Sequence, residues 1–173
     1  MKSTAHINGH PIHPMLIPYP FALLSGATVF DIGASITSRY PLAETGKHMA
    51  AAGIGSALVA AIPGLIDYFG SVPKGTTARR SATIHGLCNV SALICFAAAA
   101  SRRRSDGFLP RSGLSLAVLG TGLLGIGGWL GGELVYHERI GVPDEGALHL
   151  DGGGTRKHGL MAPDHPADAG LDL

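Results

Sequence analysis

Four long apolar segments restrict the folds open to this sequence. They run over about residues 20–38, 49–69, 82–100 and 113–136. With roughly 19 to 24 residues each, all four are long enough to cross a hydrocarbon core of ~30 Å as a helix. Residues 49–62 are apolar on every side, whereas a helix of a soluble bundle keeps a polar face. The sequence therefore predicts four transmembrane helices.

The composition supports a membrane protein and excludes other classes. Hydrophobic residues make up 46% of the chain and charged residues only 14%, so the charges that cover a soluble domain are missing. The net charge is +1, and no basic stripe is interleaved with aromatic residues, which argues against nucleic-acid binding. Cys88 and Cys95 lie seven apart on one predicted helix, too far to form a disulfide.

Short polar connections over residues 39–48, 70–81 and 101–112 make consecutive helices antiparallel neighbours. We therefore expect an all-α, up-down-up-down bundle within a membrane domain of residues 1–142. Residues 6–20 hold several histidines and prolines before the first helix and are expected to form a stiff cover. Residues 143–173 are polar and glycine-rich, which predicts a flexible, disordered tail. No internal repeat is evident.

The topology sorts the unusual polar residues by membrane face. Side A carries the N-terminus, the second connection and the start of the tail, and side B carries the first and third connections. Seven candidate ligands or proton carriers fall on side A: His10, His13, Asp67, His85, Asn89, Glu133 and His137. Ionisable groups near hydrocarbon are costly and usually mark a paired or functional interior. This convergence is the main functional signal.

Spacing adds detail to that signal. Glu133 and His137 lie four apart and share a helix face, as do His85 and Asn89. His10 and His13 each precede a proline, which disfavours helical backbone and predicts an extended segment. The alternative interpretation is that these histidines are ordinary hydrogen-bonding residues at the bilayer edge. Near side B, we expect Asp31 to pair with a basic residue of the first connection.

Several motifs resemble a known family. They are Gly-His-Pro-Ile-His-Pro-Met-Leu-Ile-Pro-Tyr-Pro-Phe-Ala-Leu at 9–23, Gly-Leu-Ile-Asp-Tyr at 64–68, His-Gly at 85–86 and Gly-Gly-Trp-Leu-Gly-Gly-Glu-Leu-Val-Tyr-His at 127–137. Together they resemble the bacterial DUF2231 family of predicted four-helix inner-membrane proteins, from about residue 9 to 142. Some relatives are joined to Rieske-type iron–sulfur domains, so the resemblance implies a redox setting. No defined activity comes with it.

Two classes of function remain open. The first is a membrane redox or metal-binding protein, because imidazole ligates haem iron and other transition metals and helical bundles hold such centres. Haem b would take His85 and His137 as axial ligands; a non-haem metal would draw on His10, His13, Asp67, His85, Glu133 and His137. The second is a non-catalytic scaffold or assembly subunit with a structural polar cluster. No catalytic residues are assigned, since no hydrolase motif appears.

The expected partners follow from the membrane location. They are the lipid bilayer, a membrane redox partner, and a second copy of the chain packing on the stripe of Gly125, Gly128 and Gly132. Packing of this stripe within the bundle is the first interpretation, and dimerisation is the alternative. Side B carries the dense cluster Arg102–Arg104, and the positive-inside rule then places side B in the cytoplasm and both termini in the periplasm.

Overall fold

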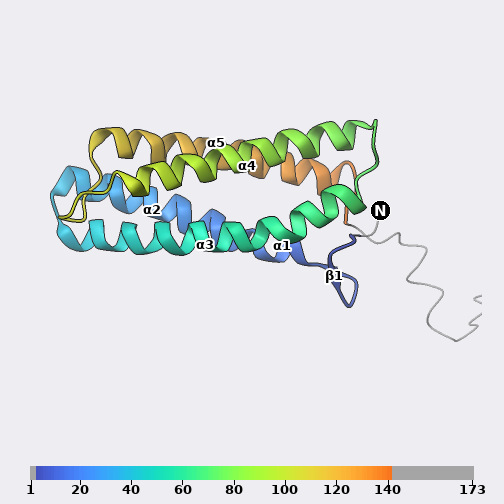
Figure 1. The fold of residues 1–173 in the computed structure, drawn as a ribbon, viewed down its shortest axis with the longest axis horizontal. Coiled ribbons are helices and arrows are strands. Elements are labelled where there is room, and N and C mark those ends of the chain that lie inside the picture. The colour runs from blue at the N-terminus through green and yellow to red at the C-terminus, as the bar shows by residue number, and fades with distance from the viewer. Residues whose placement is uncertain (1–2, 142–173) are drawn as a thin grey trace, which may run out of the picture.

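The computed structural model describes residues 3–141 and is a bundle of long helices (Figure 1). A short antiparallel hairpin comes first, with β1 at His6–Ile7 and β2 at His10–Pro11. The helices follow as α1 Ile12–Leu16, α2 Pro18–Thr37, α3 Tyr40–Gly70, α4 Thr77–Ser101 and α5 Arg111–Tyr136. Four helical segments are long and apolar enough to span a membrane, which confirms the predicted all-α membrane fold.

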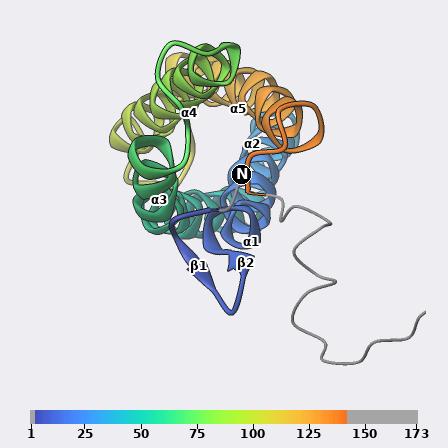
Figure 2. The same cartoon turned by 90° about the vertical axis from the view of Figure 1, so that its right-hand side faces the viewer.

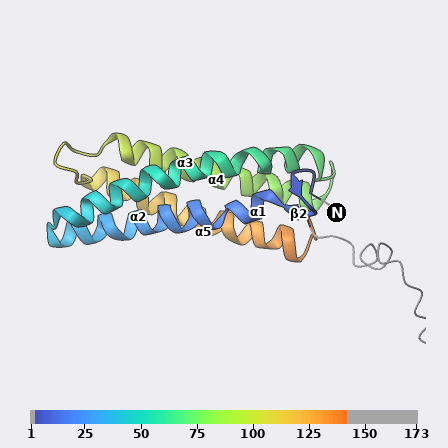
Figure 3. The same cartoon turned by 90° about the horizontal axis from the view of Figure 1, so that it is seen from below.

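The bundle consists of two helical hairpins. Viewed from its side-A end, α2 and α3 form one half and α4 and α5 the other (Figure 2). Helix α1 lies in line with α2 along one side of the bundle (Figure 3), and the two together make the candidate span Ile12–Thr37. The α2–α3 and α4–α5 connections lie at side B, while the N-terminus and the α3–α4 connection lie at side A (Figure 1).

Helix α3 begins nine residues before the apolar segment that predicted it, so the expected first connection shrinks to Ser38 and Arg39. Its first turns are polar and escape an apolar window, yet they are helical. There Glu44 accepts hydrogen bonds from Tyr40 at 3.0 Å and Lys47 at 3.3 Å, which are favourable spacings on a helix surface. Ser38 ends α2 in the left-handed conformation with φ of 56°.

The N-terminal segment is more folded than the predicted cover. His10 is extended, as its proline predicts, and follows a turn in which Asn8 and Gly9 both have positive φ. His13, in contrast, is helical, so the expectation of extended backbone was wrong there. Pro14 falls in the first turn of α1, where a missing N–H costs no helical hydrogen bond. The predicted tail lies outside the described residues.

Small residues make the contacts between helices, and large ones face outward. Leu24 is only 1% exposed and packs where a Cβ on Gly53 would lie 2.7 Å from it. Leu58 and Val90 are 56% exposed although both lie in spanning helices. This is the pattern of a lipid-exposed bundle, in which helices associate through close packing of backbones.

The glycine stripe of the fourth segment packs differently from the prediction. Gly127 and Gly131, beside that stripe, face side chains of α4. Gly125 has open space where a Cβ would lie, and a Cβ on Gly128 would only touch Phe21 at 3.4 Å. The packing stripe of α5 is therefore the neighbouring one.

We expect Leu24→Ala to lower the free energy of unfolding by about 2 kcal/mol, because a buried side chain would leave a cavity against Gly53. Leu58→Ala is the matched control on the lipid face, where the loss should stay within about 0.5 kcal/mol. Thermal unfolding in detergent measures both. Equal losses in the two variants would contradict the assigned packing.

Candidate functional site

The side-A residues singled out in the sequence come from every part of the fold. His13 lies on α1, Asp67 near the end of α3, and His85 in the first half of α4, with Asn89 at the middle of that helix. Glu133 and His137 lie at the end of α5. They do not form one group. The structure divides them into an N-terminal clamp, a histidine pair and a surface ion pair.

Asp67 clamps the N-terminal segment to α3. Its carboxylate accepts hydrogen bonds from Ser3 Oγ at 2.7 and 2.8 Å and from the Ala5 amide at 2.9 Å. Ser71, one turn further on, accepts a hydrogen bond from the Thr4 amide at 2.8 Å. Asp67 is therefore fully engaged in holding residues 3–5 over the end of the bundle.

His13 packs into a space that α3 leaves for it. Its Nδ1 lies 2.8 Å from the Ala60 carbonyl oxygen, and a Cβ on Gly64 would lie 2.8 Å from the imidazole. A carbonyl can only accept, so Nδ1 carries the proton and, in the neutral ring, Nε2 keeps a free lone pair. Pro63 stands inside α3 beside this place and removes one helical hydrogen bond there.

His85 is held in the same way by α5. Its Nδ1 lies 2.7 Å from the Gly127 carbonyl oxygen, and a Cβ on Gly131 would lie 3.1 Å from the ring. Asn89, one turn deeper, has its amide nitrogen 2.9 Å from the His85 carbonyl and 3.2 Å from His85 Nε2. The Nδ1–H tautomer of His85 is thus fixed by backbone, with Nε2 turned into a hydrogen-bond acceptor.

The two imidazoles meet edge-on across the bundle. The ring centres of His13 and His85 are 6.2 Å apart, and the ring planes are nearly perpendicular at 89°. One ring comes from the first hairpin and the other from the second. The structure thus makes a histidine pair from residues far apart in the sequence, with each ring oriented by its own hairpin.

His137 and His10 lie away from this pair. His137 is bound to Glu133 at 2.6 Å and its side chain is 72% exposed. It stands six residues past Gly131, roughly 9 Å along the helix at 1.5 Å per residue, so the structure brings His85 to His13 and not to His137. His10 is exposed on β2. Among residues 3–141, no three His, Cys, Asp or Glu side chains gather as a metal-binding group.

Arg79 is a side-A residue that the sequence did not single out. Its guanidinium lies over the Tyr68 ring, 3.6 Å from the ring centre, and donates to the carbonyls of Tyr68 and Val72. Tyr68 in turn bonds Thr83 at 2.8 Å, so the ends of α3 and α4 are joined. In the sequence, Arg79 falls in the expected connection over residues 70–81, where an arginine does not indicate stacking on an aromatic ring.

The buried ion pair at side B corrects one prediction. Asp31 pairs with Arg103 of the third connection through two hydrogen bonds of 2.8 Å, and not with a basic residue of the first connection. The side chains are only 2% and 8% exposed. Arg103 also donates to the Gly107 carbonyl at 2.9 Å. The first connection shrinks to Ser38 and Arg39, and the cation comes instead from Arg103, just after the end of α4.

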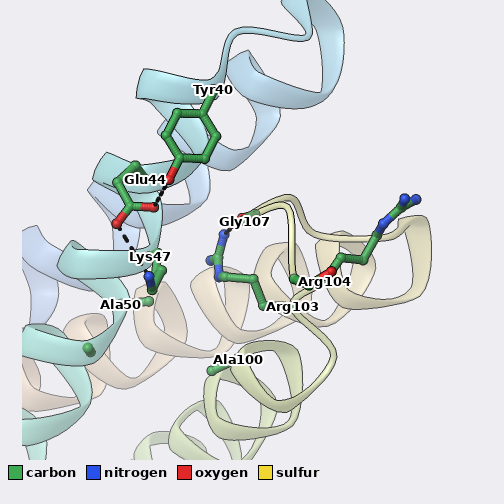
Figure 4. A pocket seen from close by; sticks show the side chains of 10 residues that line it. Tyr40, Glu44, Lys47, Ala50, Ala100, Arg103, Arg104 and Gly107 are labelled. Atoms are coloured by element: carbon green, nitrogen blue, oxygen red, sulfur yellow. Dashed lines mark hydrogen bonds and ion pairs between the residues drawn. The ribbon is translucent and has the colours of Figure 1, made fainter.

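A pocket of about 310 Å³ opens beside this ion pair (Figure 4). Its lining includes Tyr40, Glu44, Lys47 and Arg103. These groups already have partners, since Glu44 accepts from Tyr40 and Lys47 while Arg103 binds Asp31. The pocket therefore offers little unsatisfied charge to a ligand.

Replacing Asp67 with asparagine should loosen the N-terminal clamp. The neutral amide cannot accept the full set of charge-assisted hydrogen bonds from Ser3 and Ala5, which are worth roughly 1.5–3 kcal/mol. We expect amide hydrogen exchange at Ala5 and Ile12 to accelerate about tenfold or more, a factor equivalent to ~1.4 kcal/mol. Asp106→Asn at side B is the control, and unchanged exchange in Asp67→Asn would refute the clamp.

Comparison with known proteins places the chain in a family. The family model described as "Predicted membrane protein (DUF2231)" matches residues 9–144, which is most of the chain and includes all four spanning helices. No curated protein and no solved structure matches it. On this match, the chain belongs to the DUF2231 family of predicted membrane proteins.

Proposed function

We propose that this protein is a membrane electron carrier in which His13 and His85 ligate one haem b. The observation that carries the proposal is the histidine pair itself. Each ring donates Nδ1–H to a backbone carbonyl, at 2.8 Å for His13 and 2.7 Å for His85. This arrangement fixes the tautomer and orientation of metal-ligating histidines. Nε2 of His13 is left for the metal, whereas Nε2 of His85 would exchange its 3.2 Å contact with the Asn89 amide nitrogen for the metal.

The spacing of the rings supports the same conclusion. A metal ~2.0 Å from each Nε2, with each ring centre roughly 1.2 Å behind its nitrogen, requires ring centres about 6.4 Å apart. The observed separation is 6.2 Å. The ring planes meet at 89°, which is an edge-on contact between the two imidazoles.

The number of ligands favours haem over a bare ion. Zinc and non-haem iron sites draw three or four ligands from protein side chains, and no such group forms among residues 3–141. The porphyrin supplies four nitrogens itself and needs only two axial imidazoles. A haem with both axial positions filled by the protein transfers electrons and leaves no open position for a substrate.

This proposal replaces His137 by His13 in the ligand pair expected from sequence. His137 is engaged with Glu133 at the exposed end of α5, and Asp67 is engaged with Ser3 and Ala5. We assign neither to the metal. Asp67 holds the N-terminal segment at the side-A end of the bundle.

A second candidate is a structural role without a cofactor. One observation favours it: within residues 3–141, every buried side-chain nitrogen and oxygen has a hydrogen-bond partner. The polar residues of side A would then serve to fix helix ends, in a scaffold or assembly subunit. The two candidates differ in whether the Nε2 atoms of His13 and His85 bind a metal.

The cellular setting is part of the proposal. We place the protein in a bacterial inner membrane, with the Arg102–Arg104 end in the cytoplasm and the histidine pair toward the periplasm, beside a membrane redox partner. A homodimer through Gly125, Gly128 and Gly132 stays a prediction. It is supported by the open space at Gly125.

The direct test is spectroscopy of the full chain purified in detergent from cells supplied with haem precursor and iron. We expect a Soret band with a reduced-minus-oxidised signature and about one haem per chain. His13→Ala and His85→Ala should each abolish it, and added imidazole should restore it in part, because a free ligand can fill the vacated position.

His137→Ala is the matched control on the same membrane face and should keep the haem. Loss of haem in His137→Ala but not in His13→Ala would return the assignment to the pair expected from sequence. Stoichiometric copper or zinc without haem would replace haem by a bare ion at the histidine pair. A colourless, metal-free protein would support the structural role.

A further inference from the structure

The two histidines make the same contacts in their two hairpins. His13 donates to the Ala60 carbonyl and packs over Gly64, and His85 donates to the Gly127 carbonyl and packs over Gly131. His85 follows His13 by 72 positions, whereas the carbonyl and the glycine of α5 each follow their counterparts of α3 by 67. Two fixed offsets therefore relate one site to the other.

The same offsets relate the buried contacts of the bundle interior. A Cβ on Gly53 would lie 2.7 Å from Leu24, and a Cβ on Gly120 would lie 2.9 Å from Phe96. Nearer side B, a Cβ on Gly46 or Gly113 would approach the carbonyl of Ala27 or Ala99, at 3.3 and 3.6 Å. The counterparts again differ by 72 in the first helix and by 67 in the second. The contacts thus repeat from the histidines at side A to Ala27 and Ala99.

The direction of the hairpins fixes how the copies are related. Both first helices begin at side A and both second helices return there (Figure 1). Two copies with the same direction in the membrane are related by an axis along the membrane normal, as in parallel transporter repeats. Figure 2 looks along this direction, with one hairpin above and the other below.

Counterparts that touch each other must lie at the axis. In a twofold arrangement, a residue meets its own equivalent only there, while other contacts occur in pairs. His13 and His85 do so at side A. Asp31 and Arg103, also 72 positions apart, do so at side B through their two 2.8 Å hydrogen bonds. The axis therefore passes through both polar pairs.

From these contacts we infer that the membrane domain is a duplicated helical hairpin, and that Asp31 and Arg103 specify which hairpins pair. Each hairpin packs its inner face against a second hairpin of the same kind. The two hairpins match when one carries an acidic residue and the other a basic residue at the position of Asp31 and Arg103. Two copies of the first hairpin would bury Asp31 against Asp31, and two of the second Arg103 against Arg103. Such like charges, taken out of water, exclude these pairings. This inference needs no cofactor and is independent of the proposed function.

Exchanging the two charges in the full chain tests the pairing. Asp31→Arg and Arg103→Asp alone each bury two like charges and should lower the melting temperature in detergent by roughly 10 °C. Because Asp31 and Arg103 bind each other directly, the double exchange restores a pair of opposite charges and should recover at least half of that loss. An exchange that is no better than the worse single variant would overturn the pairing role.

Matched glycine substitutions test the duplication without disturbing a charge. Gly64→Ala and Gly131→Ala should both lower the melting temperature by several degrees, because each added Cβ meets a histidine ring. Gly55 and Gly122 are also counterparts, and neither has an atom within 4 Å of the added Cβ. Their alanine variants should be neutral or slightly stabilised, as glycine is the poorer helix former.

The outcomes of this series test the duplication separately from the proposed haem binding. Destabilisation confined to one member of the Gly64 and Gly131 pair, or a difference in sign between Gly55 and Gly122, would overturn the duplication. Both sets are read from unfolding alone. A protein without haem can therefore confirm the duplication, and a haem protein can refute it.

Discussion

The structure depends on the close approach of helix backbones at glycine and alanine. Lipid chains are as apolar as leucine, so burial of large side chains gives little drive for helices to associate in a membrane. Here the large side chains face outward, and within each hairpin one helix packs onto glycines of the other, as Leu24 does on Gly53 and Phe96 on Gly120. The same closeness exposes backbone carbonyls to the histidines. Packing within a hairpin therefore also orients its imidazole.

Polar contacts then join the two hairpins. Thr28 bonds Thr121 between α2 and α5, and Tyr68 bonds Thr83 between α3 and α4, both at 2.8 Å. The ion pair at side B adds a bidentate contact that is removed from water. A buried ion pair contributes specificity more reliably than stability. Each hairpin is thus packed internally, and a few hydrogen bonds and one ion pair set how the two hairpins are oriented.

The sequence predicted the fold well and the site only in part. Apolar length alone located all four spanning helices, but it missed the polar first turns of α3. The expected partner of Asp31 was therefore sought in a long first connection and not at Arg103. The alternating topology correctly put His13 and His85 at one end. It could not predict that His13, and not His137, lies beside His85. That depends on the room that Gly64 leaves for a ring and on how far along α5 His137 lies from Gly131. The repeat stayed hidden since its two helices follow different offsets, and most shared positions are only glycine or alanine.

The duplication also explains why a site would form between these histidines. Two equivalent rings at a twofold axis lie next to each other because of the symmetry. Each ring has its tautomer and orientation fixed by a carbonyl of its own hairpin. Asymmetry then enters through the neighbours. Asn89 lies beside His85, whereas its counterpart beside His13 is Ile17, and the counterpart of Asp67 is the buried Leu134. The two axial positions would therefore share geometry but differ in polarity, and hydrogen bonding around a ligand is one means of tuning a bound metal.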